Sequence, residues 1–192
     1  MISGHSWKDV QNGILHGCYL AMLPMLILMI VGVLISSWIA AGTIPTFIFY
    51  GLKLLSPEYF LFSSCLICSL GSLVTGSAWT TSATFGVAFM GIGIGLNISP
   101  ALTAGAVISG SIFGDKMSPL SDSTNLAAGI VGADLFDHIK SMVYSTGPAI
   151  ILTLATFFIL GLNISADSLP DQNKINIIFQ GLSENYSLNI IT

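Results

Sequence analysis

The chain has 192 residues, of which 53% are hydrophobic and only 7% charged, and its net charge is −4. Soluble domains carry about 25% charged residues, so this composition excludes an ordinary soluble domain. The five basic residues are all lysines, which gives no basic surface for nucleic acid.

Three long runs without Asp, Glu, Lys or Arg predict that the chain crosses a membrane several times. They cover residues 10–52, 59–114 and 141–166, and contain 43, 56 and 26 residues. A helix needs about 20 apolar residues to cross a bilayer, whereas an apolar run of about 10–14 residues is more typical of a soluble core. We therefore expect an all-α fold, a polytopic membrane helix bundle.

The first span is predicted at residues 14–39. Gly42 and Pro45 then predict a helix break. Glycine can adopt backbone conformations that end a helix, and proline has no N–H to donate to a helical hydrogen bond. The apolar stretch that follows is too short to span comfortably. We expect a short or re-entrant helix there, with Lys53 and Glu58 at the surface.

The next apolar segment begins at Tyr59 and contains a C-x-x-C pair, Cys65 and Cys68. A zinc or redox site needs further ligands and an accessible position, and this pair has no second ligand pair. We therefore interpret both cysteines as small buried residues that face a neighbouring helix.

A hydroxyl-rich stretch, TGSAWTTSATFG, follows at residues 75–86. Two interpretations remain open. The small residues can let helices approach closely, or the backbone unwinds here and its carbonyls and hydroxyls face a cavity.

Residues 110–129, GSIFGDKMSPLSDSTNLAAG, place charged groups beside one of the most apolar runs. An aspartate at the centre of a membrane helix costs about 2.5–3.5 kcal/mol, so Asp115 and Asp122 together cost about 5–7 kcal/mol if they lie there. Two structural explanations avoid or offset this cost. The motif is an exposed loop, as Pro119 permits, or Lys116 forms a static salt bridge with an aspartate.

The functional interpretation is a broken helix that lines a wet cavity near the membrane midplane. Pro119 interrupts the backbone hydrogen bonds and frees the carbonyls just before it. The motif is rich in carboxylate, hydroxyl and amide oxygens, which hard cations prefer as ligands. A carboxylate in such a site holds either a proton or Na⁺, because desolvation raises its pKa and a bound cation lowers it.

Residues 125–136 are expected to form a second half-helix, and residues 135–147 an amphipathic helix at the interface. A last span is expected at residues 148–162. The domain prediction is therefore a transmembrane region at 1–163, with about five helical segments, some broken or re-entrant. Residues 164–192 are expected to be a polar tail or the truncated start of another segment.

An intramembrane aspartyl protease also uses two aspartates, on facing helices so that both reach one water. Asp115 and Asp122 lie seven residues apart on a single broken segment, and Ile112 stands where the protease signature needs glycine. We therefore expect no enzyme activity of this kind.

The segment FGDKMSPLSDSTNLA, residues 113–127, resembles the signature of the NhaC family of Na⁺/H⁺ antiporters, which includes malate/lactate exchangers. Further blocks such as TGSAWTTSATFGVAFMGIGIGLNI extend the resemblance over residues 7–162. This chain departs from the family pattern at four positions: Ser123 stands for Thr, Ala128 for Pro, Asn97 for Gly and Ala78 for Ser.

The resemblance implies a partial inverted-repeat transporter fold with discontinuous helices, of which this chain covers part of the first half. It implies Na⁺/H⁺ exchange, with a carboxylate as a further substrate, across the plasma membrane, here a bacterial inner membrane. The lipid bilayer, Na⁺, H⁺ and a second chain that completes the fold would be the partners, and no cofactor is expected. The alternative is a non-transporting fragment or a subunit that needs such a partner chain.

The resemblance also implies the site residues. Na⁺ would bind at Asp115, Asp122 and Asn125, with Ser118, Ser121 and Thr124 around it. A second broken helix would line the opposite wall with hydroxyls from Ser77, Thr80, Thr81 and Thr84.

Overall fold

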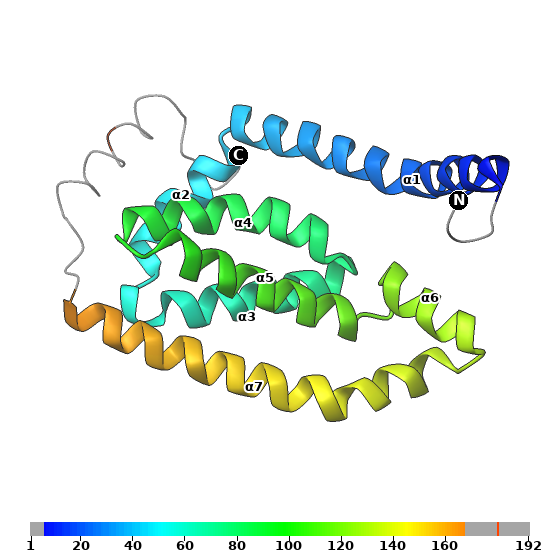
Figure 1. The fold of residues 1–192 in the computed structure, drawn as a ribbon. Coiled ribbons are helices and arrows are strands. Elements are labelled where there is room, and N and C mark those ends of the chain that lie inside the picture. The colour runs from blue at the N-terminus through cyan, green and yellow to red at the C-terminus, as the bar shows by residue number, and fades with distance from the viewer. Residues whose placement is uncertain (1–5, 168–179, 181–192) are drawn as a thin grey trace. The chain divides into compact units, whose positions relative to one another are not determined.

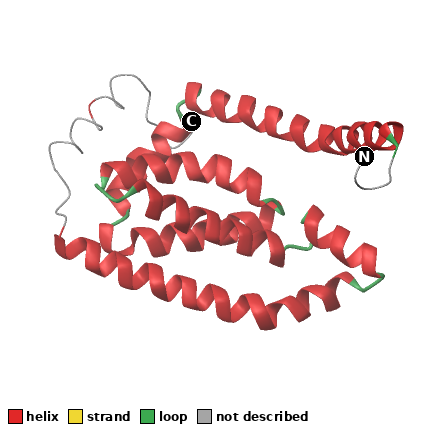
Figure 2. Cartoon of the chain, in the orientation of Figure 1, coloured by secondary structure: helices red, strands yellow, loops and turns green. Residues whose placement is uncertain are grey.

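The structure is a computed structural model that describes residues 6–167 and residue 180. In this part of the chain every regular element is a helix (Figures 1 and 2), so the all-α expectation is confirmed. The helices are α1 (Trp7–Ala40), α2 (Thr43–Leu54), α3 (Pro57–Thr75), α4 (Ala78–Gly95), α5 (Pro100–Met117), α6 (Asp122–Val131) and α7 (Leu135–Asp167).

The chain divides into two compact units, Met1–Ser37 and Trp38–Thr192. The described part of the first unit is Ser6 and most of α1, and α1 contains the predicted first span. Its start is fixed by a reciprocal cap: the Ser6 hydroxyl donates to Asp9 Oδ2 at 2.7 Å, and the Asp9 N–H donates back to Ser6 Oγ at 3.3 Å. The hydroxyl and backbone N–H of Ser6 hold the pKa of Asp9 below its ordinary value.

The predicted break after the first span lies at Gly42. This residue has φ 83° directly before α2, a conformation that glycine adopts without steric cost. Pro45 lies inside the first turn of α2, where its missing N–H has no helical partner to lose. The sequence therefore located this break correctly, and glycine produces it.

Helices α3, α4 and α5 pack side by side in the second unit (Figure 1). Helix α4 runs antiparallel to α3, because Phe60 near the start of α3 meets Phe89 late in α4, with ring centroids 6.2 Å apart. Helix α5 runs parallel to α3 and approaches it very closely. A Cβ on Gly110 would collide with the carbonyl of Cys65, and one on Gly114 with that of Ser69.

The close approach of α3 and α5 also explains the cysteine pair. Cys65 and Cys68 are fully buried on the face of α3 that meets Gly110. On the same interface the Ser72 hydroxyl donates to the carbonyl of Ser111 at 2.6 Å. Among the described residues no group of three His, Cys, Asp or Glu side chains could hold a metal ion. The two cysteines therefore serve as small packing residues, as the sequence predicted.

Helix α7 covers α3 and α5 and runs antiparallel to both. Gly161 allows it to touch the carbonyl of Glu58, and Phe158 packs on Tyr59 at 5.9 Å between ring centroids. The two expected segments at 135–147 and 148–162 form this one helix, which continues through Pro148. The expected domain boundary after residue 163 falls inside α7, and the expected tail lies outside the described residues except for residues 164–167 and 180.

Two described helices are long and apolar enough to cross a membrane, α3 over Pro57–Thr75 and α7 over Leu135–Ile164. The interrupted pair Gly32–Ala40 and Thr43–Leu52 makes a third candidate if it counts as one span. The apolar character of these helices agrees with the predicted membrane location of the chain.

Candidate ion-binding site

The charged motif forms the junction between α5 and α6, and Pro119 lies in the short loop that connects them. Helix α5 ends at Met117 and α6 begins at Asp122. Ser118 and Ser121 are fully buried in the junction. The Ser118 hydroxyl oxygen accepts the N–H of Leu120 at 3.1 Å, and Ser121 caps α6. The hydroxyls of this loop therefore stabilise the break itself.

The carbonyls that the break frees are held by side chains from α6. The Thr124 hydroxyl lies 3.3 Å from the carbonyl oxygen of Lys116 and 3.5 Å from that of Asp115. The Asn125 amide donates to the carbonyls of Pro119 and Ser121, both at 2.8 Å. Of these two predicted ligands, Thr124 thus connects α6 to the end of α5, and Asn125 connects it to the loop between the two helices.

The two aspartates occupy different electrostatic positions. Asp115 is half-buried in the last turn of α5 and accepts a hydrogen bond from the Ser123 hydroxyl at 3.2 Å. Asp122 is exposed and is the first residue of α6, where the helix dipole favours a negative charge. Among the described residues neither aspartate forms an ion pair with Lys116, so the static salt bridge is not present.

The second predicted wall lies at the start of α4. Ser77 caps this helix and accepts hydrogen bonds from the backbone N–H and the hydroxyl of Thr80, at 3.2 and 3.1 Å. Thr81 is fully buried and bonds to Thr75 through their hydroxyls at 3.1 Å. Thr84 donates to the carbonyl of Thr80 at 2.8 Å. The break between α3 and α4 is therefore a reversal of chain direction, because the two helices pack antiparallel.

The structure brings these two polar junctions together at one point. Gly76, with φ 69°, lies so close to the α5–α6 loop that a Cβ on it would be 2.7 Å from the carbonyl carbon and oxygen of Leu120. Both junctions lie at the same end of the α3–α5 layer. Within the described residues no hydrogen bond joins the predicted hydroxyls of α4 to either aspartate. The two junctions meet where Gly76 approaches Leu120.

Three residues of the site were not among the predicted ones. Ser123 holds Asp115 and also bonds to Ser121 at 2.9 Å, Gly76 permits the contact of the two junctions, and Thr75 partners Thr81. The sequence carried a signal for each. All three lie inside or beside the two hydroxyl-rich stretches, but only the folded chain shows which members face one another.

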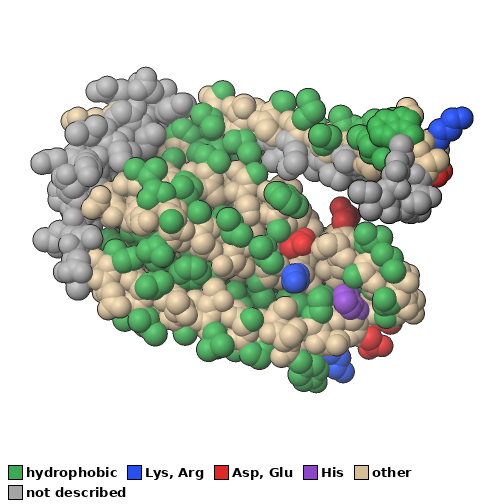
Figure 3. Space-filling model, in the orientation of Figure 1, with side chains coloured by type: hydrophobic (Ala, Val, Ile, Leu, Met, Phe, Trp, Pro, Cys, Tyr) green, Lys and Arg blue, Asp and Glu red, His purple; other side chains and the backbone are tan. Residues whose placement is uncertain are grey.

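Charged side chains are concentrated at this end of the second unit. On the face shown in Figure 3 they gather near the end of α5, α6 and the start of α7, while apolar side chains cover much of the remainder. On this face the candidate site therefore lies where the charged side chains of the second unit gather.

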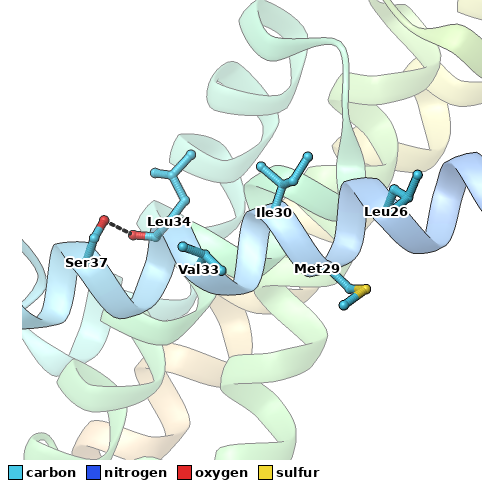
Figure 4. A pocket seen from close by; sticks show the side chains of 6 residues that line it. All are labelled: Leu26, Met29, Ile30, Val33, Leu34 and Ser37. Atoms are coloured by element: carbon cyan, nitrogen blue, oxygen red, sulfur yellow. Dashed lines mark hydrogen bonds between the residues drawn. The ribbon is translucent and has the colours of Figure 1, made fainter.

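A hollow along α1 offers no comparable chemistry. Figure 4 shows its lining side chains, which are Leu26, Met29, Ile30, Val33, Leu34 and Ser37. The polar group among them, the Ser37 hydroxyl, donates to the carbonyl of Leu34 within the helix at 2.7 Å. Apart from this one hydroxyl the lining is apolar, and it contains no charged side chain.

Comparison with known proteins identifies the family of this chain. Residues 1–124 and 110–191 match the Na⁺/H⁺ antiporter family. The Na⁺/H⁺ antiporter NhaC of Alkalihalophilus pseudofirmus is 44% identical over 97% of this chain and 40% of its own length. The malate-2H⁺/Na⁺-lactate antiporter of Bacillus subtilis is 41% identical over 97% of this chain, and the arginine/ornithine antiporter ArcD of Halobacterium salinarum is 37% identical over 98%.

The chain spans about 40% of the length of these relatives. No solved structure matches it. The family match covers nearly the whole chain, and it agrees with the resemblance of the charged motif at the α5–α6 junction. The chain belongs to the Na⁺/H⁺ antiporter family.

Proposed function

We propose that this chain provides an ion-binding part of a secondary transporter that exchanges Na⁺ for H⁺. The observation that supports the proposal is the α5–α6 junction, where Asp115 lies beside hydroxyl and carbonyl oxygens and the exposed Asp122 begins α6. The carbonyl end of α5 carries partial negative charge. Asp115 adds a full negative charge there, so the junction attracts a cation.

Exchange results because Na⁺ and H⁺ compete for the same carboxylates. Na⁺ binds the deprotonated form, and a proton that binds the carboxylate displaces the cation. Na⁺ and H⁺ each carry one positive charge. A carboxylate that binds them in turn is therefore neutralised in both states and does not remain as a desolvated, unpaired charge. Asn125 and the hydroxyls of Ser118, Ser121 and Thr124 supply further oxygens, and those of Ser77, Thr80, Thr81 and Thr84 supply the opposite wall across the Gly76–Leu120 contact.

Transport also requires that the site open to each side of the membrane in turn. In inverted-repeat transporters one repeat moves against the other around the site. We propose that α1–α7 form part of one such repeat in the bacterial plasma membrane. The remaining part of the fold would then come from sequence outside these 192 residues or from a second chain. The relatives, which are more than twice as long, support this arrangement.

The relatives also support an organic substrate besides the ions. Two of them are named for malate and lactate or for arginine and ornithine, and all four compounds carry a carboxylate. We propose a carboxylate as co-substrate here. We propose no cofactor, because ion exchange involves no covalent step, and no enzyme activity.

Exchange can be measured in everted membrane vesicles that contain the chain. Addition of Na⁺ should dissipate an imposed pH gradient, and Asp122→Asn should abolish this response. Asp137→Asn is the matched control, since Asp137 is also exposed and lies in the first turn of α7, away from the junction. Unchanged exchange in Asp122→Asn would remove the ion-site assignment.

The second candidate function is that of a subunit that transports only with a partner, and the 40% coverage of the relatives favours it. Proteoliposomes with the purified chain alone separate the two functions. Na⁺-dependent proton movement by the chain alone supports a complete exchanger, whereas its appearance only after the missing part is added supports the subunit. Na⁺ movement without counter-movement of protons would indicate a channel and contradict both.

A further inference from the structure

An open groove of about 190 Å³ lies between α5 and α7, beside the ion-binding junction but on another side of α5. Four of its lining residues are polar: Ser109 and Lys116 on α5, and Thr146 and Thr153 on α7. Ile112 and Ala149 are among the apolar ones. All the lining residues belong to two helices that pack against each other in this chain, so the groove needs no other part of the protein.

The last turn of α5 carries two adjacent side chains of opposite charge that face different helices. Asp115 turns toward α6, where its carboxylate accepts the Ser123 hydroxyl, whereas Lys116 lines the groove toward α7. Within the described residues the side-chain ammonium of Lys116 has no ion pair or hydrogen-bond partner. Lys116 is exposed, so its ammonium is accessible to an anion that enters the groove.

The hydroxyls of the groove divide into donors and acceptors. Thr146 donates to the carbonyl of Met142 at 2.7 Å and Thr153 to that of Ala149 at 2.8 Å, so both are left as acceptors. Ser109 has no hydrogen-bond partner among the described residues and can donate. The groove therefore offers one cation, one free donor and two acceptors, which fits an acid that carries both a carboxylate and a hydroxyl or amine.

We propose that this groove binds the carboxylate of a small organic acid, with Lys116 as its counter-charge and Ser109 as a second donor. The volume is below the range of about 300–1,000 Å³ that holds drug-sized ligands, which favours a small acid. The inference rests on the proposed function in one respect, that the acid is a co-substrate of the exchanger. Binding itself can be measured without transport.

The positions of the two sites also predict that they influence each other. Na⁺ at Asp115 would add positive charge one residue away from the bound carboxylate, and would favour its binding. Because such coupling is reciprocal, the acid should raise the affinity for Na⁺ by the same factor, about fivefold or more.

The test measures equilibrium binding of radiolabelled lactate and malate to the 192-residue chain in phosphatidylcholine nanodiscs. Lys116→Met should weaken binding by about 10-fold to 100-fold, the usual effect of losing a hydrogen bond to a charged group. Lys116→Arg should retain part of the affinity. Lys140→Met is the matched control, because Lys140 is exposed on α7 and does not line the groove, and it should bind as the unmodified chain does.

A second variant tests the groove without removing its charge. Ala149 is exposed and lines the groove, so Ala149→Trp should fill the groove and block binding. Equal loss of affinity in Lys116→Met and Lys140→Met, or full binding by Ala149→Trp, would overturn the proposal. Absence of binding by the unmodified chain would also overturn it, while Na⁺-dependent proton movement in the vesicle assay would still support the proposed exchange.

An anionic lipid headgroup shares the chemistry of a carboxylate, and one further comparison separates them. Lactate binding should be the same in nanodiscs with and without phosphatidylglycerol. Loss of lactate binding when phosphatidylglycerol is present would show that the lipid headgroup occupies the groove, and would contradict the proposal.

Discussion

Substitution of Gly76 by alanine should disrupt the contact between the two polar junctions. Gly76 has φ 69°, and its added Cβ would lie 2.7 Å from the backbone of Leu120. Gly76→Ala therefore carries two free-energy costs, one for the left-handed backbone conformation and one for the steric clash with Leu120. Gly132 is a matched control, because it has φ 67° at the end of α6 and nothing lies within 4 Å of an added Cβ. Gly132→Ala carries the backbone cost alone.

The magnitudes follow from these two terms. A left-handed conformation costs an L-residue about 1–2 kcal/mol, and forcing a methyl group into a packed contact costs about 1–3 kcal/mol. Gly76→Ala should therefore destabilise the fold by about 2–5 kcal/mol and Gly132→Ala by about 1–2 kcal/mol. At about 2–4 °C per kcal/mol for a chain of 150–250 residues, the melting temperatures of the two variants should differ by about 2–12 °C.

The assay is thermal unfolding of both variants in the same detergent, followed by the vesicle exchange assay. Gly76→Ala should melt lower than Gly132→Ala and should lose more Na⁺-dependent proton movement, because it separates the two walls of the proposed site. Equal melting temperatures would refute the close approach of Gly76 and Leu120. Lower stability with full exchange would show that this contact is structural and does not form the ion site.

Two further predictions follow from other close contacts. Gly114→Ala should destabilise the α3–α5 interface by about 1–3 kcal/mol, because its Cβ would meet backbone atoms of Ser69 and Leu73. Thermal unfolding measures this effect. The control is Gly129→Ala, whose Cβ would meet nothing, and it should be neutral or stabilising. Ser123→Ala should lower the apparent Na⁺ affinity of exchange by about threefold to tenfold, the value of one lost hydrogen bond. Ser123→Thr keeps the hydroxyl and should retain the affinity. Equal affinities in the unmodified chain and both variants would contradict a role for Ser123 at Asp115.

Most of the helical organisation could be predicted from the sequence. Long charge-free runs predicted helices long enough to cross a membrane, and α3 and α7 have the length and apolar character for this. Glycine predicted the break at Gly42. Pro148 misled the prediction, since a segment was expected to begin there and α7 continues through it. A proline removes one helical hydrogen bond, but long apolar helices of membrane proteins tolerate proline because local adjustments satisfy the freed backbone group.

Asn97 shows how a local rule explains a departure from the family pattern. It stands where the resembling family has glycine, and it lies at the end of α4 with φ 59°. The N–H of Ile98 reaches the carbonyl of Gly93 at 2.8 Å, which closes the helix in the usual left-handed cap. Asparagine tolerates this conformation better than other side chains with a Cβ, so the cap survives the substitution.

The sequence by itself determined the class of protein, the family resemblance and the positions of the two polar stretches, because composition and backbone-breaking residues act locally. Only the tertiary structure decided that Gly76 meets Leu120, that Ser123 holds Asp115, and that Lys116 faces a groove away from its neighbouring aspartate. These pairings join residues on different helices. They depend on how closely small residues let α3, α5 and α7 approach, which no local pattern specifies.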